Sequence, residues 1–149
     1  MTAGRPVSLK AQAVRLLARR EYARSDLEQR LLAKGAPRAD VAAVLDELVA
    51  RGLLSNERYA RALVAQKSGR YSRRSIGGEL KRHGVDAEAI GAALSDAGVD
   101  DDTALIALWQ RRFGVAPSND REKARQVRFL QARGFDLSAI LKMLRTRSS

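Results

Sequence analysis

Three glycines, Gly35, Gly84 and Gly134, stand in matching sequence contexts that are 49 and 50 residues apart. Apolar residues recur at offsets of −4, +1, +6 and +10 from each glycine. They are Leu31, Ala36, Val41 and Leu45 in the first copy, Leu80, Val85, Ile90 and Leu94 in the second, and Leu130, Phe135, Ile140 and Leu144 in the third. A period of this length is typical of helical repeat arrays. The chain is therefore expected to contain three related units.

The offsets within each copy describe two amphipathic helices that meet at a turn. The glycine is expected to follow the end of the first of these helices, in the left-handed conformation that glycine adopts without strain. The residues just before the three glycines are Lys34, His83 and Arg133, whose cations suit the C-terminal end of a helix. The residues two positions after them, Pro37, Asp86 and Asp136, commonly start helices. Ser25 and Glu28 have the spacing of a capping box for the middle helix of the first unit.

A further helical pattern precedes each pair, at residues 9–19, 56–66 and 103–112. No period-2 alternation is long enough to predict a strand. The expected fold is all-α, with three tandem three-helix repeats at 9–54, 55–99 and 100–149, loosely packed end to end into an elongated molecule after a disordered N-terminus at 1–8. Gln126 stands where the other units have Leu27 and Ile76, so helix packing is expected to be less regular in the third unit.

Basic residues outnumber acidic ones by 28 to 17, which gives a formal net charge of +11. Such a charge favours polyanionic partners, including nucleic acid, an anionic membrane surface or an acidic protein face. The chain has no cysteine, which excludes disulfides, thiolate nucleophiles and cysteine zinc sites. No segment has the length and apolarity of a signal peptide core or a membrane span. We expect a cytoplasmic protein that needs no cofactor and has no membrane role.

Candidate catalytic and metal-binding residues have simpler structural interpretations. His83 is the only histidine, and its place before a capping glycine favours a role at the helix end over that of a catalytic base. Asp100, Asp101 and Asp102 are interpreted as a helix cap rather than a metal site. No GxxxxGK[ST] phosphate loop is present. We therefore predict that the chain is not an enzyme.

A helix-turn-helix DNA reader is disfavoured, because the third helix of the first unit carries Asp40, Asp46 and Glu47 and that of the second carries Glu88 and Asp96. The positive charge gathers on the first and middle helices of units two and three instead. The expected contact residues for DNA or a filament are Lys67, Arg70, Arg73, Arg74, Lys81, Arg82, Arg111, Arg112, Arg121, Lys123, Arg125 and Arg128. Trp109 is assigned to the core, and Tyr71 is a candidate for base stacking.

Two adjacent glycines, Gly77 and Gly78, interrupt the middle helix of the second unit. A helical wheel places Gly78 on the basic side, opposite Ile76 and Leu80, with Gly77 at its flank. We interpret the pair as a smooth basic strip that another backbone can approach, and close packing between helices remains the alternative.

Three stretches resemble the bacterial RecX family of regulators of the RecA recombinase: RLLARREYARSDLEQRLLAKG, ERYARALVAQK and RYSRRSIGGELKRHGV. The resemblance extends from about Val14 to Leu144. It implies an all-helical, non-catalytic monomer that binds the RecA filament and the single-stranded or duplex DNA within it, through a surface around Arg70 to Arg82. It also implies that binding inhibits strand exchange, the filament ATPase and the filament's co-protease activity. A general binder of single-stranded nucleic acid, or a helical adaptor whose charge is incidental, remains the alternative.

Overall fold

A computed structural model describes residues 8–98 and 100–148, and these residues form α-helices and no β-strand. The helices are α1 (Leu9–Arg19), α2 (Arg24–Ala33), α3 (Arg38–Ala50), α4 (Asn56–Lys67), α5 (Arg73–Arg82), α6 (Ala87–Ala97), α7 (Asp101–Arg112), α8 (Asp120–Ala132) and α9 (Leu137–Ser148). An isolated bridge between Ser68 and Tyr71 is the one β-type pairing in this part of the chain. The all-α prediction is confirmed.

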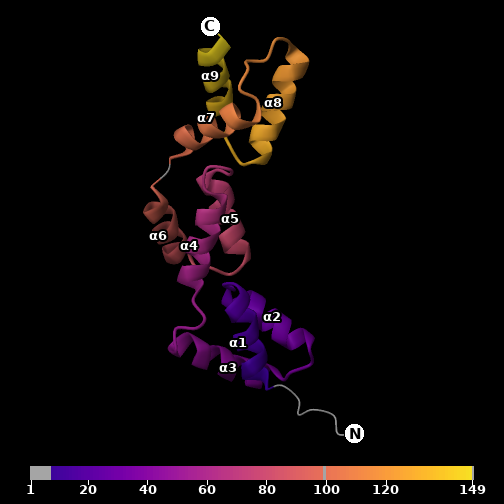
Figure 1. The fold of residues 1–149 in the computed structure, drawn as a ribbon, viewed down its shortest axis with the longest axis vertical. Coiled ribbons are helices and arrows are strands. Elements are labelled where there is room, and N and C mark those ends of the chain that lie inside the picture. The colour runs from indigo at the N-terminus through magenta and orange to yellow at the C-terminus, as the bar shows by residue number, and fades with distance from the viewer. Residues whose placement is uncertain (1–7, 99, 149) are drawn as a thin grey trace.

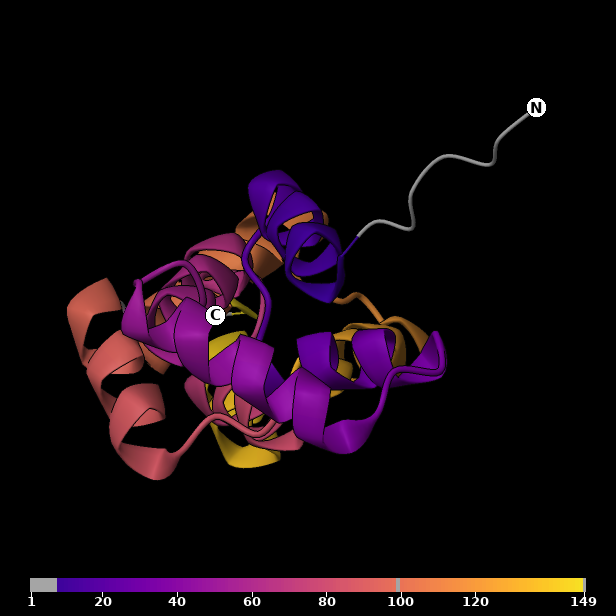
Figure 2. The ribbon, with the colours of Figure 1, turned by 90° about the horizontal axis from the view of Figure 1, so that it is seen from below.

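The helices group in threes, and the three groups stack along the long axis of an elongated molecule (Figure 1). Viewed from below, along that axis, the groups lie over one another (Figure 2). The predicted tandem arrangement is thus confirmed. The disordered N-terminus was predicted for 1–8, of which 1–7 lie outside the described residues. Ser8 is described, and its Oγ accepts a hydrogen bond from the backbone N–H of Ala11 at 3.1 Å, so it caps α1.

Each group has its own hydrophobic core, built mainly from its own three helices. Leu31, Leu80 and Leu130 hold the same position in the three middle helices, and all three are fully buried. Trp109 is 4% exposed and lies in the third core, as predicted. The repeat read from the sequence is therefore a repeat of core positions.

Gly35, Gly84 and Gly134 follow the middle helices with φ angles of +89°, +82° and +91°, which confirms the predicted left-handed turns. The capping box at Ser25 is wrong, because α2 begins at Arg24 and has no side-chain cap of its own. The backbone N–H of Arg24 donates instead to Oδ1 of Asn56, at the start of α4, over 2.8 Å. The cap of α2 therefore comes from the next unit along the chain.

The joint between the first and second units is formed where the N-terminus of α2 meets the C-terminus of α5. The Ser25 hydroxyl donates to the backbone oxygen of His83 at 2.6 Å, and Nδ1 of His83 lies 2.8 Å from the Asp26 carboxylate. Arg58 and Glu21 add an ion pair of 2.7 Å. His83 does end α5 as predicted, and it also binds the neighbouring unit.

The joint between the second and third units repeats this geometry. The N–H of Ser72, before α5, donates to the backbone oxygen of Arg133, after α8, at 2.9 Å. The N–H of Arg73 donates to the Asp101 carboxylate at the start of α7, also at 2.9 Å. Both joints thus bring the middle helices of successive units end to end, and they are more specific than the loose packing expected from the sequence.

Gln126 occupies a core position of the third unit and is 4% exposed. Its Oε1 accepts a hydrogen bond from Nε1 of Trp109 at 2.9 Å, and its Nε2 donates to the backbone oxygen of Val115 at 3.1 Å. Because both ends of the amide are bonded, the side chain can be buried without leaving an unsatisfied polar group. Gln126, which departs from the apolar pattern of the repeat, is therefore accommodated in the core by its hydrogen bond with Trp109.

Candidate nucleic-acid and protein interface

The exposed face of α5 carries Arg74, Lys81 and Arg82, all predicted as contact residues. None of the three has an ion pair or a side-chain hydrogen bond to any described residue. The core side of the same helix carries Ile76 and Leu80, which are buried. The helix therefore presents these three cations to solvent, as the helical wheel predicted.

The two glycines of α5 have different surroundings. A Cβ atom at Gly77 would lie 3.4 Å from Cγ2 of Ile90 and 3.7 Å from Cδ1 of Leu94, so Gly77 faces α6. A Cβ atom at Gly78 would meet only Nη1 of Arg82, at 3.7 Å. Helix packing thus accounts for Gly77, and only Gly78 lies on the basic strip.

The exposed face of α8 carries the second set of predicted cations. Arg121, Arg125 and Arg128 are exposed and lie on one side of the helix, opposite the buried Gln126 and Leu130. Lys123 is also exposed. Within the described part of the chain, none of these four groups is in an ion pair shorter than 4 Å.

Other predicted contact residues are bonded within the molecule. Lys67 pairs with Glu79 at 2.7 Å, Nη1 of Arg73 donates to the backbone oxygen of Leu94 at 2.8 Å, and Arg111 donates to that of Gly69 at 3.0 Å. The remaining two differ from these: Arg112 lies over aromatic rings, and Arg70 is exposed. The structure thus separates cations that support the fold from cations that face solvent.

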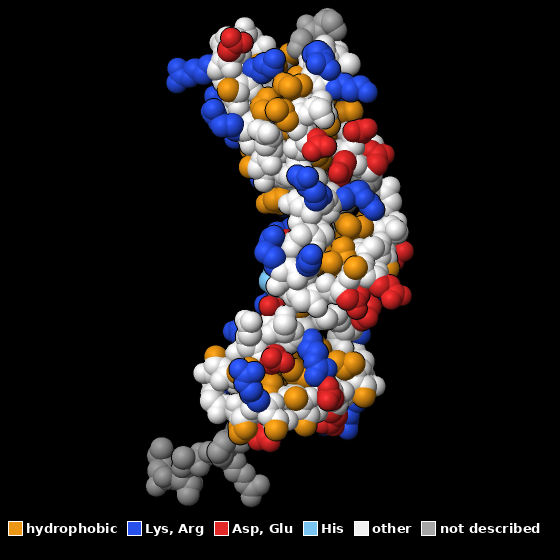
Figure 3. Space-filling view, turned by 180° about the vertical axis from the view of Figure 1, so that it is seen from behind, with side chains coloured by type: hydrophobic (Ala, Val, Ile, Leu, Met, Phe, Trp, Pro, Cys, Tyr) orange, Lys and Arg blue, Asp and Glu red, His pale blue; other side chains and the backbone are white. Residues whose placement is uncertain are grey.

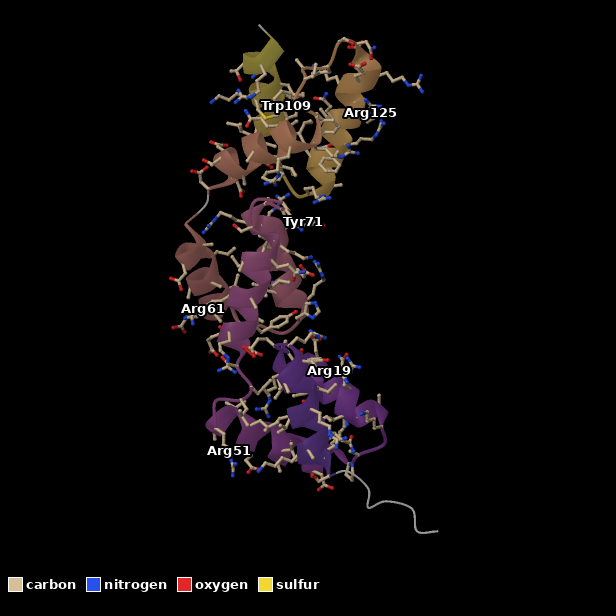
Figure 4. All side chains as sticks on the ribbon, in the orientation of Figure 1. Arg19, Arg51, Arg61, Tyr71, Trp109 and Arg125 are labelled. Atoms are coloured by element: carbon tan, nitrogen blue, oxygen red, sulfur yellow. The ribbon has the colours of Figure 1, made fainter. Side chains whose placement is uncertain are left out.

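Apart from Lys123, the solvent-facing cations of these two sets come from helices on one side of the molecule. Helices α5 and α8 are on the same side in Figure 1, and Figure 4 labels Arg125 on that side. Figure 3 shows this side from behind as the hollowed left edge of the outline, with Lys and Arg side chains along it. We call this surface the inner face and define it by Arg74, Lys81, Arg82, Arg121, Arg125 and Arg128.

Acidic side chains gather on the opposite, outer edge, which is the right edge in Figure 3. This edge is formed by α6, with exposed Glu88 and Asp96, and by the start of α7. Oδ1 of Asp100 accepts a hydrogen bond from the N–H of Thr103 at 2.7 Å, which holds the pKa of Asp100 below its usual value. Asp100 is therefore the cap of α7, as predicted for the aspartate run. Among residues 8–98 and 100–148, no group of three or more potential metal ligands occurs.

Sequence reasoning considered Tyr71 but missed Phe113 and Phe129. The rings of Phe113 and Phe129 lie edge to face beside the core of the third unit, with centroids 5.5 Å apart and planes at 89°. In the sequence, both phenylalanines stand close to arginines, in RRF and RFLQAR. This proximity of aromatic and basic residues is the signal that could have identified them. None of the described helices has the length and apolarity to cross a bilayer.

Comparison with known proteins finds a family match for each of the three units. Models of the first, second and third three-helix domains of RecX match residues 10–48, 55–94 and 100–144. The regulatory protein RecX of Chromobacterium violaceum is 40% identical over 137 residues, which are 92% of this chain and 89% of the relative. That of Pseudomonas savastanoi pv. phaseolicola is 41% identical over 144 residues, which are 95% of this chain and 93% of the relative.

Solved structures agree in fold. The crystal structure of RecX from Lactobacillus salivarius superimposes with a TM-score of 0.70 at 15% identity, covering 94% of each chain. Another crystal structure of regulatory protein RecX gives a TM-score of 0.69 at 18% identity over 93% of this chain and 73% of the other. These relatives are regulatory proteins and not enzymes, in agreement with the prediction from the sequence. The chain belongs to the RecX family of regulatory proteins.

Proposed function

We propose that this chain binds the RecA recombinase filament on DNA through its inner face, and that binding inhibits strand exchange, the filament ATPase and the co-protease activity. The observation that carries the proposal is the separation of charge. Cations that form no ion pair within residues 8–98 and 100–148 gather on α5 and α8, whereas acidic side chains gather on α6 and the start of α7. A molecule with such a separation binds polyanions in one orientation.

The end-to-end arrangement of α5 and α8 supports a filament as the partner. At 1.5 Å per residue, two helices of 10 and 13 residues extend over roughly 35 Å. A surface of this length can contact several phosphates or neighbouring protein subunits at once. Individually weak contacts then add, because after the first contact the others form within one complex. We propose that the protein acts in this way as a cytoplasmic monomer, without a cofactor.

The second candidate is a general binder of single-stranded nucleic acid. It is favoured by the aromatic rings and arginines of the second joint, since such rings stack on bases without regard to sequence. The two functions differ in what limits inhibition. A filament binder acts on the assembled recombinase, whereas a simple competitor removes free DNA.

A titration of the DNA-dependent ATPase of RecA tests the proposal. With circular single-stranded DNA in excess over the added protein, we expect half-inhibition at well under one protein per RecA subunit. Because the binding surface is electrostatic, the inhibition should weaken steeply as salt is raised from about 50 to 200 mM. Inhibition that begins only when the DNA is saturated would favour the second candidate, and no inhibition at any ratio would contradict both.

A further inference from the structure

A continuous stack of cations and rings crosses the joint between the second and third units. Its members, in order, are Lys67, Tyr71, Arg133, Phe129, Arg112 and Phe113, and we call them the cation–aromatic stack. The distances from each cation to the neighbouring ring centroids are 4.9, 4.8, 4.8, 5.1 and 5.3 Å along this order. All lie within the range of attractive cation–π contacts. Figure 4 labels Tyr71 at the junction of the two units.

One end of the stack has a structural role. Arg133 of the third unit lies over Tyr71 of the second, and it also donates to the backbone oxygen of Arg70 at 3.4 Å. Lys67 covers Tyr71 as well and is paired with Glu79. The ring of Tyr71 is thus engaged by cations from both units, and this end of the stack holds the joint.

The other end of the stack opens into a hollow with a volume of about 470 Å³ between the end of α7 and α8. Its lining residues are Arg112, Phe113, Val115, Ala116, Glu122, Arg125 and Gln126. The volume lies within the range of pockets that bind small ligands. Arg125 belongs also to the inner face, so the hollow adjoins the basic surface.

The polar groups of the hollow are arranged for a planar ligand that carries negative charge. Arg112 is exposed, and its guanidinium lies 5.1 Å and 5.3 Å from the ring centroids of Phe129 and Phe113. A guanidinium is planar and stacks on aromatic groups, so Arg112 can hold a further ring on its solvent side. Arg125 supplies a second cation at the rim, where a phosphate can reach it.

The lining also contains one carboxylate, that of Glu122. Its Oε2 accepts hydrogen bonds from the N–H and the hydroxyl of Ser118, both at 2.9 Å, and these bonds lower the pKa of Glu122. The carboxylate is therefore ionised and tied to the loop before α8. With two arginines against this one acid, the lining keeps a positive charge.

We propose that this hollow binds an unstacked nucleobase of single-stranded nucleic acid, with the base stacked against Arg112 and Phe113 and an adjacent phosphate bound by Arg125. A single strand fits better than a duplex, because paired and stacked bases have no free face for a side chain. The inference deepens the proposed function by naming the state of the DNA that meets the third unit. It rests on the proposal that this side of the chain meets DNA.

The test measures binding of a fluorescein-labelled 20-nucleotide oligothymidine by anisotropy, with the full chain and no RecA. Arg112→Lys keeps the charge but removes the planar group, and we expect it to weaken binding roughly fivefold or more, the effect of losing one stacked base. Phe113→Leu keeps an apolar side chain and should act in the same direction. Arg145→Lys, an exposed arginine on α9 outside the hollow, is the matched control and should bind as the wild type does.

The single tryptophan gives a second readout. Nε1 of Trp109 donates to Gln126, which lines the hollow, so oligothymidine should change the tryptophan emission of the wild-type protein. Equal oligothymidine binding by the Arg112→Lys, Phe113→Leu and Arg145→Lys variants would overturn the inference, as would an equal loss of affinity for a 20-base-pair duplex. If these variants bind alike while the wild type still inhibits RecA, the hollow is excluded and the proposed function stands. If oligothymidine binding depends on Arg112 but RecA is not inhibited, the filament proposal fails and the hollow stands.

Discussion

Replacing Arg74 and Arg82 by glutamate is expected to raise at least tenfold the protein concentration that half-inhibits the RecA ATPase. Both side chains lie on the inner face of α5, and the double change converts two attractive contacts with a polyanion into two repulsive ones. The salt dependence of inhibition should become shallower, because fewer counterions are released on binding. The measurement is the ATPase titration of the variant beside the wild type.

The double variant is expected to keep its fold. Arg74 lies in the first turn of α5, where an acidic residue is favourable, and Arg82 is the last residue, where it is unfavourable. Each effect is about 0.3–1 kcal/mol, so the two largely offset each other. Arg51→Glu/Arg61→Glu is the control for net charge, because it makes the same change on the other side of the molecule (Figure 4). It also breaks the ion pairs of Arg51 with Glu47 (3.1 Å) and of Arg61 with Asp96 (3.5 Å), so its fold is checked by circular dichroism as well. Similar loss of inhibition in both variants would mean that net charge, and not the inner face, determines binding.

The largest expected effect on stability is that of Gly134→Ala. A Cβ atom at Gly134 would clash with Oγ of Ser72 and would lie 2.6 Å from Cβ of Ser75. Ser72 cannot move away freely, because it is 1% exposed and its Oγ accepts the capping hydrogen bond from the N–H of Ser75. We expect a loss of about 1–2 kcal/mol from the left-handed backbone and a further 1–3 kcal/mol from the steric conflict at the joint.

Gly35→Ala separates these two causes. Gly35 has nearly the same φ angle, +89° against +91°, but a Cβ atom there would have no neighbour within 4 Å. Thermal and urea unfolding followed by circular dichroism should therefore show a clearly smaller loss for Gly35→Ala. Equal losses in the two variants would contradict the assignment of Gly134 to the joint. Because Gly134 follows α8 and contacts the start of α5, its substitution should also weaken inhibition of RecA.

The sequence was sufficient for the three units because their signals are local. The offsets from Gly35, Gly84 and Gly134 identified the core positions, and the left-handed turns followed from glycine chemistry. The joints have no such local signature. Ser25 and His83 are 58 residues apart, and nothing around Ser25 distinguishes a side chain that caps its own helix from one that binds the next unit.

The candidate site was predictable only as far as local patterns reach. Composition and helical wheels indicated which side of α5 is basic, and Arg74, Lys81 and Arg82 are exposed there. They did not distinguish these cations from Arg73, whose guanidinium donates to the backbone of α6. Whether an arginine bonds within the molecule depends on the distances between helices, which the sequence does not give. The contacts of Arg112 with the rings of Phe113 and Phe129 depend on the same distances.

The central claim is that the inner face, and not the outer edge, meets the RecA filament. Site-specific photo-crosslinking tests it most directly, with benzoylphenylalanine placed at position 128 on the exposed side of α8 or at position 88 on α6, where the natural residues are Arg128 and Glu88. Each protein is mixed with RecA assembled on single-stranded DNA, irradiated, and analysed by gel and mass spectrometry. We predict cross-links to the filament from position 128 and almost none from position 88. Cross-links chiefly from position 88, or equally from both positions, would contradict the proposed orientation.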